Sequence, residues 1–263
     1  LAICLAGLWS EYVEKRGFWL TIMPGADPVW SAETANILDR LGFHQGASLA
    51  APERYLVNVD LSAEMLRRSL DQKWRYNLKR AEKNAFEITI LEAGDGLDRF
   101  MALYDRMLQR KDFNDGSAIW TLPDILATRT AELLPMVVMV RHEGRDTAGA
   151  IVDTSGERAV YLYGATDDRA LPLKAGYALH WWIAERLCAM PGVKWYDLGG
   201  DQGDQGLRQF KKGFVGKEGV IAVMPAERHA SASLKGWIAG RTVYGLRGAQ
   251  QVAADLHQRL RLS

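Results

Sequence analysis

Two stretches of this sequence are the most informative, Tyr196-Asp197-Leu198-Gly199-Gly200 and, shortly after it, Phe210-Lys211-Lys212-Gly213-Phe214. The first stretch is typical of a short strand that ends in an acidic residue and two glycines. The second is typical of a short helix that carries adjacent lysines. Cations and free backbone N–H groups near a strand end stabilise an anionic substrate or a developing oxyanion. The alternative is structural: two glycines usually form a turn, and two lysines usually lie on a solvated face.

Composition limits the classes of protein that the chain can belong to. Its 263 residues, 48% of them hydrophobic, are enough for one large domain or two ordinary ones with a substantial core. Lys and Arg number 33 and Asp and Glu 32, which gives a net charge of +1. This balance excludes a strongly basic nucleic-acid binder as the first expectation, but it leaves room for a local basic groove.

Cysteine, histidine and apolar runs narrow the classes further. Cys4 and Cys188 are far apart, so we expect neither a disulfide framework nor a cysteine-based zinc site. This use of cysteine is typical of proteins in a reducing compartment. The five histidines are scattered, and no metal site is expected. The sequence contains no run of about 18 apolar residues, so we expect no membrane-spanning helix. The apolar segment 1–8 is expected to be a buried helix or strand, and its abrupt start suggests that N-terminal sequence is missing.

The order of expected elements predicts an α+β fold with a central mixed sheet. Strands are expected from their β-branched and aromatic content at 18–23, 55–60, 86–91, 136–141, 146–154, 158–164, 194–198 and 219–224. Helices are expected at 31–41, 63–84, 97–111, 122–134, 175–190 and 234–260. Two related units joined by the long helix 63–84 fit this order, with boundaries at 1–84, 85–230 and a C-terminal helical segment 231–263.

Several residues are candidates for binding a substrate. The segment 73–83 holds five cations, and helical spacing puts Arg75 and Lys79 on one side of it. They indicate either a phosphate-facing surface or a solvated face, and the solvated face is favoured. Arg110 ends a helix, where the helix dipole alone explains a cation. Tyr161 and Tyr163 alternate along a strand, so we expect both on one face, either as donors in a cleft or as cover for the core.

Taken together, these motifs resemble the Fem family of non-ribosomal peptidyl transferases, whose members resemble paired GNAT acetyltransferase domains. The resemblance covers roughly residues 17–245. It rests on the expected strand 18–23 and helix 31–41 that lead into Leu41-Gly42-Phe43, and on the stretch 52–61 and the basic segment 73–83. It also rests on the strand 161–165 and on the two opening stretches. It implies a GNAT-like mixed β-sheet flanked by helices, in which residues 1–84 form a first unit that is N-terminally incomplete, together with the linking helix.

The resemblance also implies an activity. Fem enzymes move an amino acid from aminoacyl-tRNA onto the side-chain amine of a peptidoglycan precursor that is UDP-linked or lipid-linked. Lys211 then lies near the tetrahedral intermediate, with Lys212 as its rival. Phe210 packs beside the terminal adenosine, and Asp197 orients Lys211 or the attacking amine. Arg75, Lys79, Arg110, Tyr161 and Tyr163 complete the candidate binding residues.

Aminoacyl-tRNA is the co-substrate in this interpretation, so no further cofactor is expected. The implied location is the cytoplasm, with the inner face of the membrane as an alternative, and no integral membrane segment is expected. The rival function is a coenzyme-A-dependent N-acyltransferase of the GNAT superfamily in exopolysaccharide or natural-product biosynthesis. GNAT enzymes hold the coenzyme A pyrophosphate with Gln/Arg-x-x-Gly-x-Gly/Ala, and here Leu173 stands where Gln or Arg is usual.

Overall fold

The computed structural model describes residues 1–26, 31–47, 53–111, 118–128, 130, 133–201 and 203–261. The chain forms two compact units, one from residues 1–52 and 223–263 and the other from residues 53–222. This division differs from the expected boundaries. Residues 53–84 belong with the second unit, and the C-terminal segment groups with the N-terminal residues.

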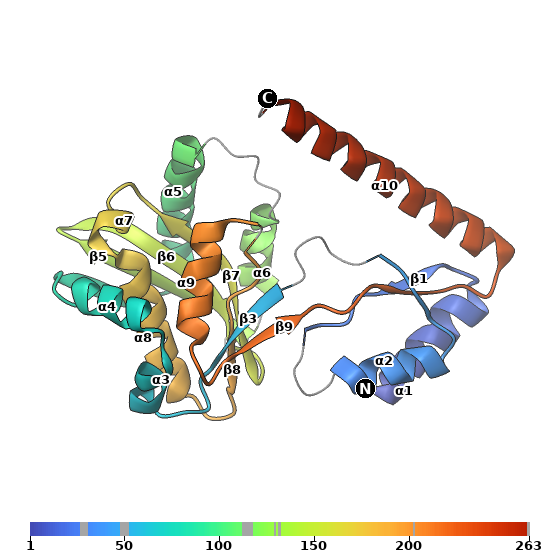
Figure 1. The fold of residues 1–263 in the computed structure, drawn as a ribbon, viewed down its shortest axis with the longest axis horizontal. Coiled ribbons are helices and arrows are strands. Elements are labelled where there is room, and N and C mark those ends of the chain that lie inside the picture. The colour runs from blue at the N-terminus through green and yellow to red at the C-terminus, as the bar shows by residue number, and fades with distance from the viewer. Residues whose placement is uncertain are drawn as a thin grey trace. The chain divides into compact units, whose positions relative to one another are not determined.

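A mixed, seven-stranded sheet forms the centre of the second unit (Figure 1). Its strands lie in the order β4 (Phe86–Leu91), β5 (Met136–His142), β6 (Arg145–Asp153), β7 (Arg158–Thr166), β8 (Trp195–Asp197), β3 (Glu53–Asn58) and β9 (Val220–Val223). The meander β4 to β7 is antiparallel, β7 and β8 are parallel, and β8 and β3 are antiparallel. The predicted α+β class with a mixed sheet flanked by helices is confirmed.

Helices cover both faces of this sheet (Figure 1). Helix α5 (Ala93–Lys111) packs on one face, where Phe100 and Leu103 join a buried cluster with strand residues such as Ile151. The other face carries α3 (Ala63–Ser69), α4 (Gln72–Ala81), α8 (Ala175–Cys188) and α9 (Gln205–Val215). The short helices η2 (Ile119–Thr121), α6 (Leu122–Thr128) and α7 (Ala170–Leu173) complete the unit, and α6 ends earlier than the helix expected at 122–134.

The prediction of one long linking helix at 63–84 is wrong. Helix α3 ends before Leu70, whose backbone is extended (φ −59°, ψ 149°), and α4 begins at Gln72. The amide of Asp71 donates to the carbonyl of Gly213 on α9 at 3.1 Å. A backbone contact to a distant helix therefore fixes the break, and both short helices pack inside the second unit. Strand β3, expected in the first unit, pairs with β8 in the large sheet.

The first unit contains the three-stranded sheet β1 (Leu20–Ile22), β10 (Arg228–Ala230) and β2 (His44–Gln45), paired antiparallel in that order. Around it lie α1 (Ala2–Leu8), the π-helix η1 (Trp9–Lys15), α2 (Ser31–Arg40) and α10 (Leu234–Arg261). Its small core includes Leu38 and Phe43. Segment 1–8 forms a helix, which was one of the two expected alternatives. Leu5 is its only buried side chain, so the expected burial of the segment is wrong for most of it. The expectation that the two units are structurally related to each other stays a prediction.

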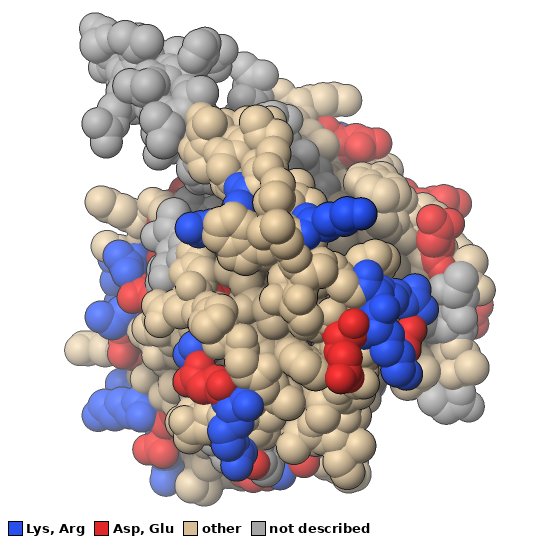
Figure 2. Space-filling model, turned by 90° about the vertical axis from the view of Figure 1, so that its right-hand side faces the viewer, with Lys and Arg blue, Asp and Glu red and all other residues tan. Residues whose placement is uncertain are grey.

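Two surface properties bear on function. Among the described residues, no helix is both long and apolar enough to cross a membrane. On the face that Figure 2 presents, Lys and Arg side chains lie close to Asp and Glu side chains, with apolar and neutral surface between them. This mixture agrees with the net charge of +1.

The two candidate tyrosines of β7 lie on opposite faces, which corrects the expectation of a shared face. Tyr161 pairs with Val152 and Tyr163 with Ile151, so Leu162 is an extra residue that forms a β-bulge. The bulge breaks the period of two. Tyr161 consequently packs in the cluster on the α8 side, and Tyr163 packs in the cluster on the α5 side.

Candidate active site

The turn after β8 is held in shape by Asp197 and Lys211. Oδ1 of Asp197 accepts from the amide of Gly199 at 2.8 Å, and Gly199 has a left-handed φ of +74° that favours glycine. From α9, Nζ of Lys211 donates to the carbonyl oxygens of Leu198 and Gly200, both at 2.5 Å. Asp204 caps the start of α9, and its side chain accepts from the amide of Leu207 at 2.7 Å. The two opening stretches of sequence are therefore joined directly.

Lys211 is a buried cation, with 6% of its surface exposed. Its pKa is lowered from 10.5 to about 8, chiefly by burial and next by the Arg54 guanidinium, while Asp197 and Asp201 act in the opposite direction. Its neighbour His180 is also buried, and its Nδ1 lies 3.0 Å from the Tyr196 hydroxyl. Burial and then the charge of Lys211 lower the pKa of His180 to about 3, so this imidazole is neutral.

Asp197 does not bond to Lys211. Its Oδ2 accepts from Nη2 of Arg54 at 3.0 Å and lies 3.7 Å from Nη1 of Arg158. The carboxylate thus influences Lys211 through its charge and through the turn, rather than by a hydrogen bond. Arg54 is a site residue that the sequence analysis missed, because only the pairing of β3 with β8 brings it to Asp197.

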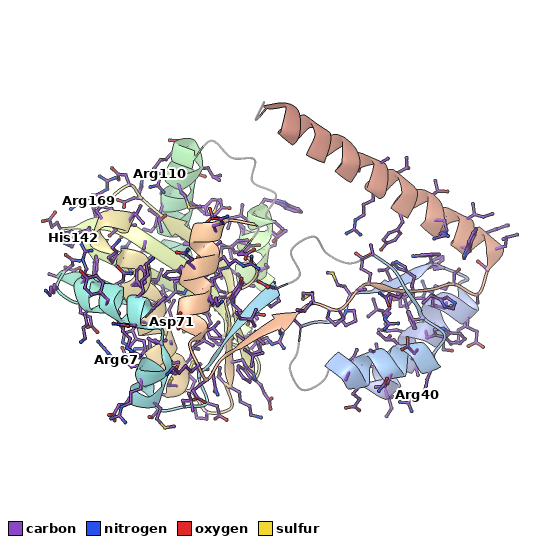
Figure 3. All side chains as sticks on the ribbon, in the orientation of Figure 1. Arg40, Arg67, Asp71, Arg110, His142 and Arg169 are labelled. Atoms are coloured by element: carbon purple, nitrogen blue, oxygen red, sulfur yellow. The ribbon has the colours of Figure 1, made fainter. Side chains whose placement is uncertain are left out.

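An aromatic pocket of about 310 Å³ lies between α4, α8 and α9. Phe210 forms part of its wall, with its ring centroid 4.9 Å from that of Tyr177 and 5.8 Å from that of Trp74. Beneath it, Trp74 stacks on Phe214 at 4.4 Å. The complete lining is Asp71, Lys73, Trp74, Tyr177, Gly206, Gln209, Phe210, Lys212 and Gly213. In Figure 3, Asp71 marks the start of α4, where this lining begins.

The pocket contains two exposed cations, Lys73 and Lys212. The sequence predicts Lys212 as a binding residue, whereas Lys73 belongs there only to the basic segment 73–83. Its position directly before the core residue Trp74 was the available signal. Apolar rings beside two ammonium groups suit a ligand that combines a flat ring with a phosphate.

Three other candidates lie outside this pocket. Nη1 of Arg75 donates to the carbonyls of Arg68 and Leu70 at 2.9 and 2.5 Å, which satisfies the end of α3. Lys79 is exposed and is not part of the pocket lining, which fits the solvated-face interpretation. Tyr161 is packed against the ring of His180 at 4.9 Å, and burial raises the pKa of its hydroxyl to about 12.

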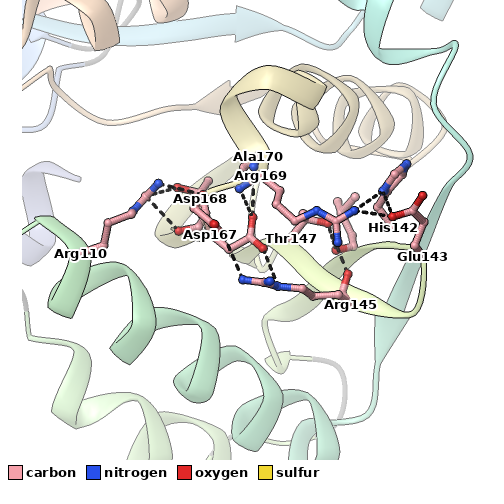
Figure 4. Close-up of polar contacts among 11 residues, drawn as sticks. Arg110, His142, Glu143, Arg145, Thr147, Asp167, Asp168, Arg169 and Ala170 are labelled. Atoms are coloured by element: carbon pink, nitrogen blue, oxygen red, sulfur yellow. Dashed lines mark hydrogen bonds and ion pairs between the residues drawn. The ribbon is translucent and has the colours of Figure 1, made fainter.

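Arg110 supports the loop before α7, as Figure 4 shows. It donates to the carbonyl of Asp167 at 2.9 Å and to that of Thr166 at 3.2 Å. Oδ1 of Asp167 accepts from the amides of Arg169 and Ala170 at 2.9 and 3.1 Å and so begins the short helix. The guanidinium is thus used inside the fold, and the structure does not bring Arg110, Arg75, Lys79 or Tyr163 into the aromatic pocket.

Comparison with known proteins assigns the family. The acetyltransferase (GNAT) domain family matches residues 65–212, more than half of the chain. The chain belongs to this family. Within the described residues, no group of three or more His, Cys, Asp or Glu side chains is arranged to hold a metal ion. No curated protein sequence matches significantly.

Solved structures of similar fold refine this assignment. The structure of FemX matches with a TM-score of 0.71 at 14% identity, covering 93% of this chain and 77% of FemX. The C-terminal domain of a putative lysylphosphatidylglycerol synthetase from Agrobacterium fabrum matches with a TM-score of 0.55 at 16% identity, covering 86% and 72%. The L-PGS structure from Bacillus licheniformis matches with a TM-score of 0.50 at 13% identity, covering 82% of this chain and 71% of that structure's chain. The fold is therefore Fem-like, and the chain is a GNAT-type acyltransferase.

Proposed function

We propose that this protein is an aminoacyltransferase that moves an amino acid from aminoacyl-tRNA to the amine of a peptidoglycan precursor side chain. The observation that carries the proposal is the geometry of Phe210 and Lys211. Phe210 faces the aromatic pocket, while the adjacent Lys211 reaches back to the turn after β8. In this proposal the aromatic pocket binds the terminal nucleoside of the tRNA, and Lys211 supplies the cation for the reacting ester. Residence in the cytoplasm or at the inner face of the membrane belongs to the same proposal.

The chemistry needs no covalent enzyme intermediate. The acceptor amine attacks the ester carbonyl carbon, a C–N bond forms, and the carbonyl π electrons move to oxygen. When the tetrahedral intermediate collapses, the ester C–O bond breaks, the ribose hydroxyl leaves with a proton, and the amine nitrogen loses one. Because the ester is already activated, catalysis rests on positioning and on stabilising the oxyanion, which is the role proposed for Lys211.

The rival function, coenzyme-A-dependent acyl transfer, is disfavoured by the loop before α8. This segment is the helical turn α7, in which the amide of Leu173 donates to the carbonyl of Arg169 and that of Lys174 to the carbonyl of Leu171, each at 3.2 Å. These two amides are therefore not available to a pyrophosphate, and Leu173 supplies no cation, so only the first amides of α8 remain for such a group. The carbonyl of Leu173 also accepts from Nδ2 of Asn84 at 2.8 Å, which fixes this helical turn to the segment that follows α4.

Calorimetry on the purified protein separates the two functions. One titration uses acetyl-CoA, and the other uses a tRNA carrying a non-hydrolysable amide-linked amino acid. We expect saturable binding of the tRNA ligand and no measurable heat with acetyl-CoA. Tight binding of acetyl-CoA without a response to the tRNA would reverse the ranking. The putative lysylphosphatidylglycerol synthetase among the similar structures justifies a further assay with phosphatidylglycerol vesicles as the acceptor. Transfer to the lipid would change the proposed acceptor and leave the proposed donor unchanged.

A further inference from the structure

Gly199 is bordered by two cations that come from distant parts of the chain. The position that a Cβ would take on Gly199 is 3.8 Å from Nζ of Lys211 and 4.0 Å from Nη1 of Arg54. Gly199 is half-buried, and the Arg54 side chain keeps 31% of its surface exposed. The space beside the glycine is therefore bordered by two cations, of which Arg54 is partly exposed to solvent.

Each cation is anchored and still keeps a donor for a ligand. Arg54 bonds to Asp197 through Nη2, and within the described residues its Nη1 makes no hydrogen bond. Lys211 has three N–H donors as an ammonium, and two of them go to the carbonyls of Leu198 and Gly200. The anchoring bonds fix both groups in place before a ligand arrives, as a preorganised site requires.

Asp197 neutralises only one of the positive charges beside Gly199, because Arg54 and Arg158 both lie close to its carboxylate, at 3.0 and 3.7 Å. Both oxygens of Asp197 are engaged, Oδ1 by the amide of Gly199 and Oδ2 by Arg54. Asp201 accepts from the Tyr55 hydroxyl at 2.9 Å and lies 3.3 Å from Nε of Arg208, so its charge is already paired. The buried ring of His180 on α8 is neutral and adds no charge of either sign.

We propose that Arg54 and Lys211 together form an oxyanion subsite beside Gly199, in which Arg54 binds the same substrate oxygen as Lys211. This inference rests on the proposed function, since the oxygen concerned is the ester carbonyl oxygen that becomes negative when the amine adds. Arg54 is then a catalytic residue that acts in the transition state. The role of Asp197 is to hold Arg54 and the turn in position.

Transfer kinetics on four proteins test the subsite. They are the wild type, Arg54→Gln, Arg54→Lys, and Arg158→Gln as a control that removes the other arginine beside Asp197. Loss of one oxyanion donor costs on the order of a hundred-fold in kcat. We expect Arg54→Gln to show that loss with little change in KM for aminoacyl-tRNA, Arg54→Lys to recover part of it, and Arg158→Gln to keep most of the rate. Equal losses in Arg54→Gln and Arg158→Gln would show that Arg54 acts only through Asp197.

A substrate-free measurement keeps this inference separate from the proposed function. The pKa of Lys211 is followed by NMR in protein with ¹³C-labelled lysine, with and without inorganic phosphate as the anion probe, and the signal is assigned with Lys211→Arg. Phosphate is expected to raise the pKa of Lys211 saturably in the wild type and in Arg158→Gln, and not in Arg54→Gln. No effect in the wild type, or the same effect without Arg54, overturns the subsite. If phosphate acts as expected but no transfer occurs, the subsite stands and the proposed function fails.

Discussion

The ammonium of Lys211 on α9 donates to the carbonyl of Gly200 at 2.5 Å, so the helix is fastened to the turn that follows β8. The same nitrogen serves the carbonyl of Leu198. Lys211 is therefore part of the fold as well as a candidate for the reaction, and a substitution at this position changes stability as well as rate.

Lys211→Met is expected to reduce both stability and turnover. It leaves two carbonyl oxygens of the turn without their donor, which costs about 1–3 kcal/mol for each that becomes buried and unsatisfied. The rate should fall on the order of a hundred- to a thousand-fold, because an oxyanion donor acts mainly in the transition state. Chemical denaturation and single-turnover transfer measure the two effects separately.

Lys212→Met is the matched control, because Lys212 is exposed at the pocket rim. It should leave stability nearly unchanged and weaken binding of the tRNA more than turnover. Lys211 has no special role in the reaction if the two variants lose turnover equally, or if Lys211→Met retains most of its activity.

The rate of transfer is expected to fall as the pH rises through about 8. The pKa of Lys211 in the folded protein is about 8, lowered chiefly by burial, so the ammonium loses its proton above that pH. In the unfolded chain this proton stays bound to about pH 10.4. The folded state therefore binds fewer protons between these values, and the cost of burying the charge, present below pH 8, is relieved as the pH rises.

Initial rates from pH 6.5 to 9.5, corrected for spontaneous ester hydrolysis without enzyme, measure this titration. The Arg54→Gln variant should move the midpoint upward, because it removes a repelling cation. A rate that stays level to pH 9.5 would mean that the charge of Lys211 is not needed.

The two pocket cations are expected to contact phosphates of the tRNA end. Lys73→Gln and Lys212→Gln should each weaken tRNA binding severalfold and reduce the slope of log K against log salt by about 1. Lys83→Gln makes the same charge change on an exposed residue of the same basic segment, outside the pocket lining. Fluorescence anisotropy at several salt concentrations compares the three, and identical slopes for all of them would contradict a pocket-specific contact.

Gly164→Ala is expected to destabilise the protein by about 2 kcal/mol or more through steric conflict with Tyr161. A Cβ on Gly164 would lie 1.4 Å from the Tyr161 hydroxyl oxygen, so the two side chains cannot coexist in this bulged strand. In a Tyr161→Ala background the same change should cost little, which a double-mutant cycle of thermal or urea unfolding would detect. Gly176→Ala on α8 is the control, since nothing lies within 4 Å of its Cβ position.

The sequence predicted those elements whose limits are set by local residues. Strand 86–91 coincides with β4, because its β-branched and aromatic residues end at a clear boundary. The break at Leu70 and the bulge at Leu162 were not predictable in this way. Neither position carries Gly or Pro, and each feature is fixed by hydrogen bonds to distant segments, α9 in one case and β6 in the other.

The site was predictable to a similar extent. The motif drew attention to Phe210 and Lys211, and their types suggested stacking and oxyanion chemistry. The approach of Arg54 depends on sheet pairing across 143 residues, and the burial of Lys211 with its two carbonyl partners depends on how α9 packs against the turn after β8. Cations such as Arg75 and Arg110 look like binding residues in a sequence, because their partners are backbone carbonyls that no sequence pattern marks.

Product mass after incubation with aminoacyl-tRNA is the most direct test of the proposed function. The protein is mixed with a complete pool of aminoacyl-tRNAs and either a UDP-linked or a lipid-linked peptidoglycan precursor, and the precursor is analysed by mass spectrometry. The account predicts a mass increase equal to one amino-acid residue, abolished by ribonuclease and strongly reduced in Lys211→Met. An unchanged precursor mass with every aminoacyl-tRNA, together with acylation of an amine when acetyl-CoA is supplied instead, would contradict it.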